Sequence, residues 1–323
     1  MRKPINREEI NGRIYDHNLA LKTVQKKDSE NFGKEFINGT LDVATDDDGL
    51  NIVTVHFTYV TAVTSKNTAN ATFAALKKII DGQCKTVVND GFEAANFIKI
   101  TPSIGLNDFF TNRGEEEDVL VSAKRNEGGF VTFVSKLNDP AKRSTFECDM
   151  LITETRVVEA NEERGIDNDY LVLKGFIFDF REAILPVEFS VKTAGGMKYF
   201  ESLGIEKTNP VFTKVWGNIE SQNIVTRREE ENAFGEPAVK EFTRTIREYI
   251  VTGCAKEPYE IGDEKNGITV DEVNKRLENR EVYLADVKKR QEEYQASKNN
   301  AAATTTPTAA SATTSAAAGG FNF

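Results

Sequence analysis

The stretch Asn51 to Thr61 reads NIVTVHFTYVT and consists mostly of β-branched and aromatic residues. This composition favours a β-strand over a helix. The segment FINGTLDV at 36–43 alternates between apolar and polar residues, and the turn sequence DDDG at 46–49 lies between the two. The sequence therefore predicts a pair of strands joined by a tight connection.

One short helix is predicted after this pair, over residues 70–81. Four apolar residues fall on one side of it, and a glycine follows its end: Phe73, Leu76, Ile79, Ile80 and Gly82. Further strands are predicted at 96–101, 118–123 and 129–137. The first half of the chain thus reads as strand, strand, helix, strands.

The same order of elements recurs in the second half. Strands are predicted at 146–158, 170–180 (YLVLKGFIFDF), 187–192, 211–222 and 241–253, with a short helix at 196–203. If Asn51–Val53 is aligned with Tyr170–Val172, Phe57 meets Phe176 and Tyr59 meets Phe178. This register indicates an internal repeat.

Two such blocks predict a mainly β protein with a few helices, built from small barrels rather than from a parallel α/β sheet. A five-stranded barrel with a helix after the third strand is the oligonucleotide/oligosaccharide-binding (OB) architecture. We expect OB-like domains at 32–143 and 144–258. Residues 1–31 are polar and mixed in charge, so we expect an arm or a short docking helix there.

The region after the second block predicts one long helix, at 269–297 within a segment that begins at 259. Thr269 and Glu272 form a capping box, and apolar residues recur at alternating spacings of three and four. This narrow stripe either packs along the chain's own domains or pairs with another copy of the helix. Residues 298–323 are mostly Ala and Thr, so we expect a disordered tail.

Aromatic and basic residues share one face of two predicted strands. On 211–219, Val211, Val215 and Ile219 alternate with Phe212, Lys214 and Trp216. On 170–180, Val172, Lys174, Phe176, Phe178 and Phe180 form the corresponding face. Rings beside lysines suit single-stranded nucleic acid, because bases stack on rings while cations contact phosphates.

These patterns give the candidate nucleic-acid-binding residues. They are Phe57, Tyr59, Lys174, Phe176, Phe178, Phe212, Lys214, Trp216, Arg227, Arg228, Arg244 and Arg247. The alternative for the aromatic residues is a place in the barrel core. The alternative for the arginines is a solvated hairpin with ion pairs to the neighbouring glutamates at 229–231 and 248.

Several classes of protein are excluded by composition. The chain has 41 basic and 51 acidic residues, a net charge of −10, which does not suit a protein that coats duplex DNA by charge. Because it lacks an apolar run of about 18 residues and an apolar signal segment, we expect neither secretion nor membrane insertion. The only histidines are His17 and His56, and no enzyme motif or metal-ligand spacing is present, so we expect no catalysis, cofactor or metal.

The two blocks, the strands NIVTVHFTYV and VFTKVWGNIES, and the tail that ends in Phe323 resemble bacteriophage-type single-stranded-DNA-binding proteins with tandem OB folds. The resemblance implies non-catalytic, largely sequence-independent binding of single-stranded DNA during phage DNA replication or recombination, in the host cytoplasm. It also implies that Phe321 and Phe323 recruit a replication protein, although the acidic residues usual in such tails are missing here.

A second interpretation is a phage structural or adaptor protein whose small β-domains make protein contacts. The acidic charge and the long amphipathic helix suit this interpretation equally well, and the helix at 269–297 would then allow self-association.

Overall fold

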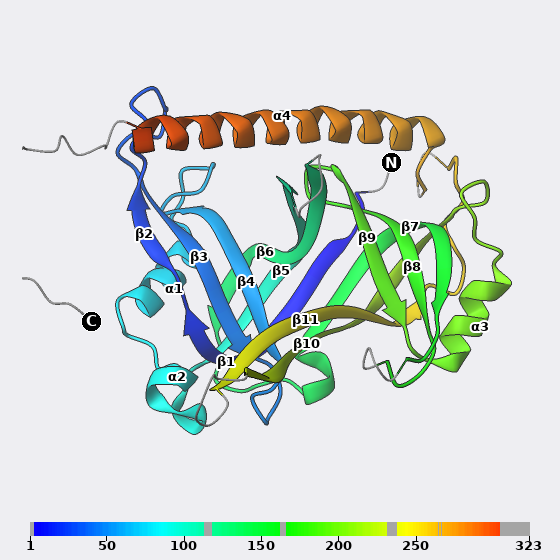
Figure 1. The fold of residues 1–323 in the computed structure, drawn as a ribbon, viewed down its shortest axis with the longest axis horizontal. Coiled ribbons are helices and arrows are strands. Elements are labelled where there is room, and N and C mark those ends of the chain that lie inside the picture. Colours follow the sequence, from blue (N-terminus) through cyan, green and yellow to red (C-terminus); the bar gives the residue numbers. More distant parts are fainter. Residues whose placement is uncertain are drawn as a thin grey trace, which may run out of the picture. The chain divides into compact units, whose positions relative to one another are not determined.

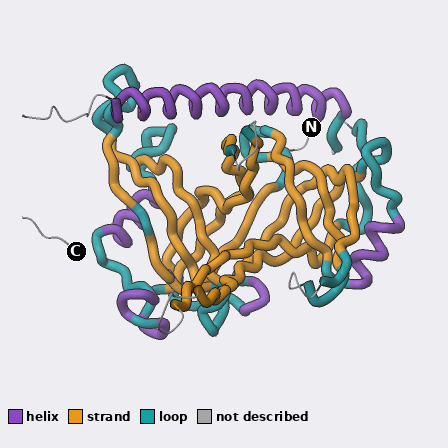
Figure 2. Tube along the Cα trace, in the orientation of Figure 1, coloured by secondary structure: helices purple, strands orange, loops and turns teal. Residues whose placement is uncertain are grey.

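Strands are the main secondary structure of the computed structural model, which describes residues 3–112, 118–161, 166–230, 238–263, 265 and 267–303 (Figure 1 and Figure 2). For 222–246 and 298–303 only the backbone is described. The strands are β1 (Asn6–His17), β2 (Ala20–Thr23), β3 (Glu35–Ala44), β4 (Ile52–Thr61), β5 (Phe97–Thr111), β6 (Val119–Phe133), β7 (Ser144–Val158), β8 (Tyr170–Phe178), β9 (Ile184–Val191), β10 (Val211–Glu230) and β11 (Ala238–Cys254). The helices are α1 (Ala71–Ile80), α2 (Val87–Asp90), α3 (Ala194–Ser202) and α4 (Val270–Ala303), with 3-10 turns at Phe92–Ala94 and Pro140–Lys142. The predicted mainly β composition and the long C-terminal helix are confirmed.

Five strands of the second half close into a hydrogen-bonded ring, which we call the second ring. Its order is β7-β8-β9-β11-β10, and β10 also pairs with β7. The contact between β9 and β11 is parallel and joins Ser190 to Ile250. The helix α3 lies in the chain between β9 and β10.

Five strands of the first half form the first ring in the same order. Here β1-β3-β4-β6-β5 returns to β1, and the parallel contact joins Val55 of β4 to Asn126 of β6. The helices α1 and α2 come between β4 and β5, at the place that α3 has in the second ring. In both rings, therefore, the third strand pairs with the fifth and the fourth returns to the first.

The predicted register of the internal repeat is wrong. Aligning Asn51–Val53 with Tyr170–Val172 superposes β4, the third strand of the first ring, on β8, the second strand of the second ring. The strand order equates β4 with β9 instead. The register fails because β1, the first strand of the first ring, has a polar sequence without a strand pattern.

That first strand is β1, in the segment predicted to be an arm or a docking helix. It pairs with β3, β5 and β7, so it belongs to the first ring and joins it to the second (Figure 1). Its polar side chains bond to backbone groups: Asn11 Nδ2 donates to the Ile98 carbonyl at 3.1 Å, and Asn6 Nδ2 donates to the Ile104 carbonyl at 2.8 Å. A polar sequence can therefore form an interior strand.

Gly12 is required on β1 by the close approach of β3. A Cβ atom at this position would lie 2.1 Å from the carbonyl oxygen of Ala44, a contact that no side chain tolerates. The pairing of β1 with β3 thus depends on a residue without a side chain.

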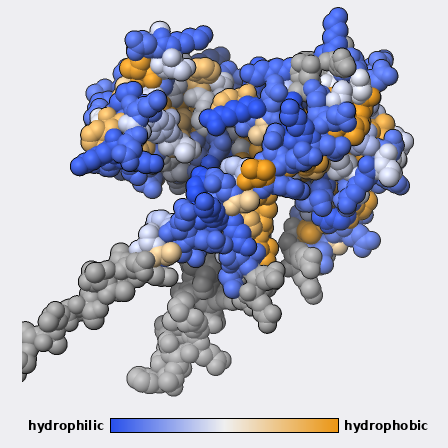
Figure 3. Space-filling model, turned by 90° about the horizontal axis from the view of Figure 1, so that it is seen from above, coloured by the Kyte–Doolittle hydropathy of each residue, from blue (hydrophilic) through white to orange (hydrophobic). Residues whose placement is uncertain are grey.

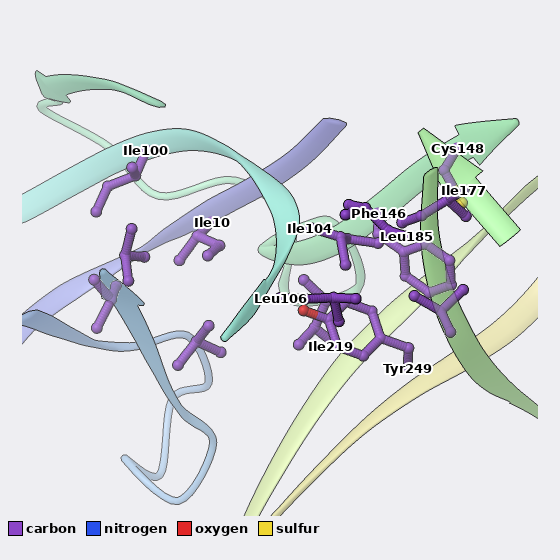
Figure 4. Close-up of a cluster of buried hydrophobic side chains, with 14 of the residues drawn as sticks. Ile10, Ile100, Ile104, Leu106, Phe146, Cys148, Ile177, Leu185, Ile219 and Tyr249 are labelled. Carbon is purple, nitrogen blue, oxygen red and sulfur yellow. The ribbon is translucent and has the colours of Figure 1, made fainter. Parts of the chain in front are cut away.

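The largest group of buried apolar residues extends through both rings. Figure 4 shows Ile10 and Ile100 at one end, Ile104 and Leu106 in the middle, and Phe146 and Tyr249 beyond them. Phe57 belongs to the same cluster and is buried inside the first ring.

A smaller apolar cluster covers part of the outside of the second ring. Phe178 of β8 and Phe212 of β10 pack against Ile268 there. The centroids of the two phenylalanine rings are 6.2 Å apart. Tyr259, Ile261, Val273 and Leu277 pack against the cluster. The segment after β11 and the first turns of α4 therefore shield rings that the strand pattern alone leaves facing outward.

The fifth strand of each ring also contacts the other ring. Lys124 of β6 donates to the carbonyl oxygen of Glu188 on β9, and its amine lies 5.1 Å from the centre of the Tyr249 ring. In the opposite sense, Arg247 of β11 donates to Thr54 Oγ1 of β4 at 2.9 Å. The rings are thus connected by crossed contacts in addition to β1.

The helix α4 begins with the predicted capping box. Thr269 Oγ1 accepts from the Glu272 backbone N–H at 3.2 Å, and Glu272 Oε2 accepts from the Thr269 N–H at 3.0 Å. The described part of the helix runs to Ala303, beyond the predicted 297, and alanines at 301–303 have high helix propensity.

The chain divides into two compact units: Met1–Asn107 with Ser122–Glu281, and Asp108–Val121 with Val282–Phe323. In the first unit, Arg276 of α4 pairs with Glu182 at 3.0 Å and lies over the Phe178 ring. In the second unit, Gln291 of α4 bonds to both backbone groups of Phe110. Of the two expected uses of the helix, packing on the chain itself is observed, while self-association stays a prediction.

A buried carboxyl group lies where the two rings meet. The Tyr249 hydroxyl oxygen is 3.0 Å from Glu8 Oε1 and 2.6 Å from Asn126 Oδ1. A phenol has one hydrogen and cannot donate to both acceptors, so a protonated Glu8 completes the arrangement. Burial raises the pKa of Glu8 to about 8, with a smaller contribution from the charge of Glu127.

We predict that this group makes the protein less stable as pH rises. The folded-state pKa of about 8 exceeds the ordinary value of 4.5, so between about pH 5 and 7 the unfolded chain loses a proton that the folded chain keeps. The free energy of unfolding should fall by about 1.4 kcal/mol per pH unit from this group. Glu8→Gln should remove that slope, because a neutral amide also donates to the tyrosine oxygen.

Urea unfolding of both proteins at pH 5 and pH 7 tests this prediction. The pKa of Lys124, lowered to about 8 by burial, lies above the window, so its titration adds no slope there. Equal slopes for the wild type and the variant would show that Glu8 is ionised in the folded protein.

Candidate nucleic-acid interface

One row of paired residues crosses four neighbouring strands and brings together the side chains of the candidate site. Arg7 of β1 is opposite Glu147 of β7, Glu147 is opposite Trp216 of β10, and Trp216 is opposite Gly253 of β11. Directly opposed residues share a face of the sheet. Lys214, two residues before Trp216, lies on the same face. We call the residues Arg7, Glu147, Trp216 and Gly253 the Trp216 row.

Gly253 provides a flat seat for the indole. A Cβ atom there would lie 2.6 Å from the indole nitrogen of Trp216, so the ring rests directly on the backbone of β11. Trp216 nevertheless remains 39% exposed. The Lys214 ammonium lies 5.7 Å from the centre of the ring, within the range of a cation–π interaction.

Lys214 and Arg7 share one carboxylate. Glu147 Oε1 is 3.0 Å from Lys214 Nζ, and Glu147 Oε2 is 2.8 Å from Arg7 Nη2. Partial burial raises the pKa of Glu147, but hydrogen bonds and charges from Lys214 and Arg7 outweigh this and lower it overall. Glu147 therefore carries its negative charge at neutral pH.

The row borders a hollow of about 350 Å³. Arg7, Glu9, Thr145, Glu147, Trp216 and Asn218 are among its lining residues. This volume lies at the lower end of the range for small-molecule pockets. Among the residues that the structure describes, no group of three or more His, Cys, Asp and Glu side chains is arranged to hold a metal ion.

The remaining exposed candidates lie elsewhere on the rings. Tyr59 of β4 is 46% exposed, and its ring centroid is 4.7 Å from that of Phe36 on β3. Lys174 of β8 is exposed, with Nζ 3.7 Å from Glu154. Arg247, exposed on β11, bonds to Thr54. In Figure 3 the visible hydrophobic residues form patches among hydrophilic ones.

Three of the predicted nucleic-acid-binding residues are corrected by burial. Phe57 points into the first ring, and Phe178 and Phe212 lie beneath the segment that follows β11. A buried ring has no free face on which a base can stack, so these residues contribute to stability. Phe176 is partly buried against the same outer cluster.

Other candidates fall outside what the structure describes. Arg227, Arg228 and Arg244 have backbone positions on β10 and β11, opposite Glu241, Lys240 and Ile224, but their side chains lie outside the described residues. Phe321 and Phe323, with the rest of the tail from 304 onward, also lie outside the described residues.

Within the described part of the chain, no helix is long and apolar enough to cross a membrane.

A family model described as YorF matches residues 5–291, from the start of β1 to the middle of α4. The chain belongs to the YorF family. No curated protein matches it. Among solved structures, it is similar to a deletion mutant of the single-stranded DNA binding protein from Thermus aquaticus, with 9% sequence identity and a TM-score of 0.44; the alignment covers 82% of this chain and 100% of that chain.

Sequence reasoning missed Arg7 and Glu147 in this YorF-family chain. Arg7 lies in a segment predicted to be an arm, and Glu147 is an ordinary polar residue at the start of a predicted strand. Their roles depend on the pairing of β1 with β7, 140 residues away in sequence. The alternation of apolar and polar residues within a short segment does not show which distant strand the segment pairs with.

Tryptophan fluorescence tests the contact between the Trp216 ring and Gly253. Because Trp216 is the only tryptophan in the chain, its emission reports on this hollow alone. In Gly253→Ala the new methyl group should displace the indole towards water and shift its emission to longer wavelength. The matched control is Gly195→Ala on α3, where a Cβ would meet nothing within 4 Å and the emission should not change. If the Gly253 variant folds and keeps the wild-type spectrum, the indole does not rest on β11.

Proposed function

We propose that this YorF-family protein binds single-stranded DNA with little sequence preference and without catalytic turnover. The observation that carries the proposal is Trp216, a partly exposed indole packed on Gly253, with Lys214 beside the ring and Arg7 lining the same hollow. A ring for stacking and cations for phosphates are the two components of sequence-tolerant strand binding.

The magnitudes are sufficient for this function. Stacking of one base on an aromatic side chain contributes about 1–3 kcal/mol and is tolerant of sequence, because every base has a flat π-face. Each phosphate neutralised by a lysine or arginine adds affinity that falls as salt rises. Tyr59, Lys174 and Arg247 are exposed and would add contacts of the same kinds along a strand.

The order of the strands supports the proposal at the level of the fold. In each ring the third strand pairs with the fifth, the fourth returns to the first, and a helix comes between the third and fourth. We interpret the rings as two OB-like barrels, an architecture often used to bind single strands. From the resemblance to bacteriophage-type single-stranded-DNA-binding proteins, we also propose that the protein acts in phage DNA replication or recombination in the host cytoplasm and that Phe321 and Phe323 recruit a replication protein.

The decisive measurement is the binding of a labelled oligothymidylate of roughly thirty nucleotides at low salt, followed by anisotropy. We expect saturable binding that weakens with salt, quenching of Trp216 fluorescence, and a loss of about 1–3 kcal/mol in Trp216→Ala. Trp216→Phe should retain part of the affinity because a ring remains. Phe130→Ala, which removes a ring that is 77% exposed but does not line the hollow, is the matched control.

Absence of binding at low salt would overturn the proposal and favour the adaptor interpretation. If Trp216→Ala and Phe130→Ala lost the same amount of affinity, the strand would not bind specifically at the hollow. Circular dichroism of each variant shows whether the fold is intact before affinities are compared.

A further inference from the structure

Arg7 of the Trp216 row and the neighbouring Lys214 are not free in this conformation, because Glu147 binds both. Arg7 comes from β1 and Lys214 from β10, so one side chain on the strand between them bridges two strands. Nearby carboxyl groups have other partners: Glu9 pairs with Lys99 at 2.8 Å, and Asp149 accepts from the Ile5 backbone N–H at 2.7 Å. Glu147 is therefore the acid aimed at the two cations.

A carboxylate in this position resembles a backbone phosphate. A phosphodiester has one negative charge shared by two non-bridging oxygens, and Glu147 presents one charge on two oxygens, each directed at a different cation. In a nucleotide, one sugar separates the flat base from its phosphate. A base on Trp216 would thus bring its phosphate to the place that Glu147 now fills.

The existing ion pairs are weak enough to be exchanged. The Arg7 side chain is 67% exposed and that of Glu147 is 26% exposed, so water and salt reach the pairs. A free monovalent anion gains little by displacing Glu147, because it brings nothing to stack on the indole. A strand gains the stacking energy at the same time.

We propose that Glu147 is an autoinhibitory counter-anion that occupies the phosphate seat of the Trp216 hollow and is displaced when a strand binds. The inference rests on the proposed function and adds its regulation. Its consequence is selection: the hollow excludes free phosphate and similar anions, yet opens to a polyanion that carries bases.

The test compares Glu147→Gln with Glu248→Gln, using the full chain and the labelled oligothymidylate over a series of salt concentrations. Both changes remove one negative charge. Glu248 is a close match, because it is 27% exposed and pairs with Lys192 at 2.7 Å, but it does not line the hollow. Thermal unfolding confirms that each variant is folded.

Glu147→Gln should bind about 2- to 30-fold more tightly at low salt, the range that two solvent-exposed ion pairs represent. Its plot of log affinity against log salt should keep nearly the wild-type slope, because Arg7 and Lys214 contact the phosphate in both proteins once Glu147 has been displaced. Glu248→Gln should keep both the wild-type affinity and the wild-type slope. Inorganic phosphate should compete more strongly with the strand in Glu147→Gln than in the wild type.

The failures are distinguishable. If the wild type binds DNA and both variants behave alike, the autoinhibition is wrong and the proposed function stands. Weaker binding by Glu147→Gln would mean that Glu147 positions the cations, which also overturns the inference. If neither the wild type nor Glu147→Gln binds, the proposed function and the inference fail together.

A second variant covers the case in which Glu147→Gln does not fold. Arg7→Gln removes the more exposed cation at the surface. If Arg7 transfers from Glu147 to a phosphate on binding, this change should weaken binding and make the salt slope shallower by about 0.7. An unchanged slope would show that Arg7 stays with Glu147 in the complex and would overturn the exchange.

Discussion

The pairing of β1 with three other strands is the constraint on which the rest of the structure depends. Along one edge, β1 pairs first with β7 and then with β3, and along its other edge it pairs with β5. Without it the first ring would have two open edges, and unpaired edges expose backbone groups that invite incorrect pairing. The same strand positions Arg7 opposite Glu147, so closure of a ring and assembly of the candidate site are consequences of one set of backbone hydrogen bonds.

Elements with strong local signals could be predicted from the sequence, and β1 could not. The run at 51–61, the helix after Asn70 and the capping box at Thr269 each carry their own pattern, because their buried or capping residues are of the expected types. The buried positions of β1 include Glu8, Asn11 and Gly12, which read as solvent-exposed or as a turn. Their use becomes clear only when the backbone groups that they contact are known.

The candidate site divides in the same way. Alternation along 211–219 placed Lys214 and Trp216 on one face, and both lie beside the hollow or line it. The same alternation placed Phe212 and Phe178 outward, but it could not reveal that Ile268 and Leu277 cover them from a distant segment. Period-two patterns indicate which way a side chain points, while its exposure is decided by tertiary contacts.

The crossed contacts of Lys124 and Arg247 make the two rings mutually dependent. Each holds the fifth strand of one ring against the third strand of the other, and Tyr249 of the second ring bonds to Asn126 of the first. A chain cut at the 143/144 boundary would leave each half with an unpartnered surface. Although the strand order repeats, the two rings form one cooperative unit and should melt in a single transition.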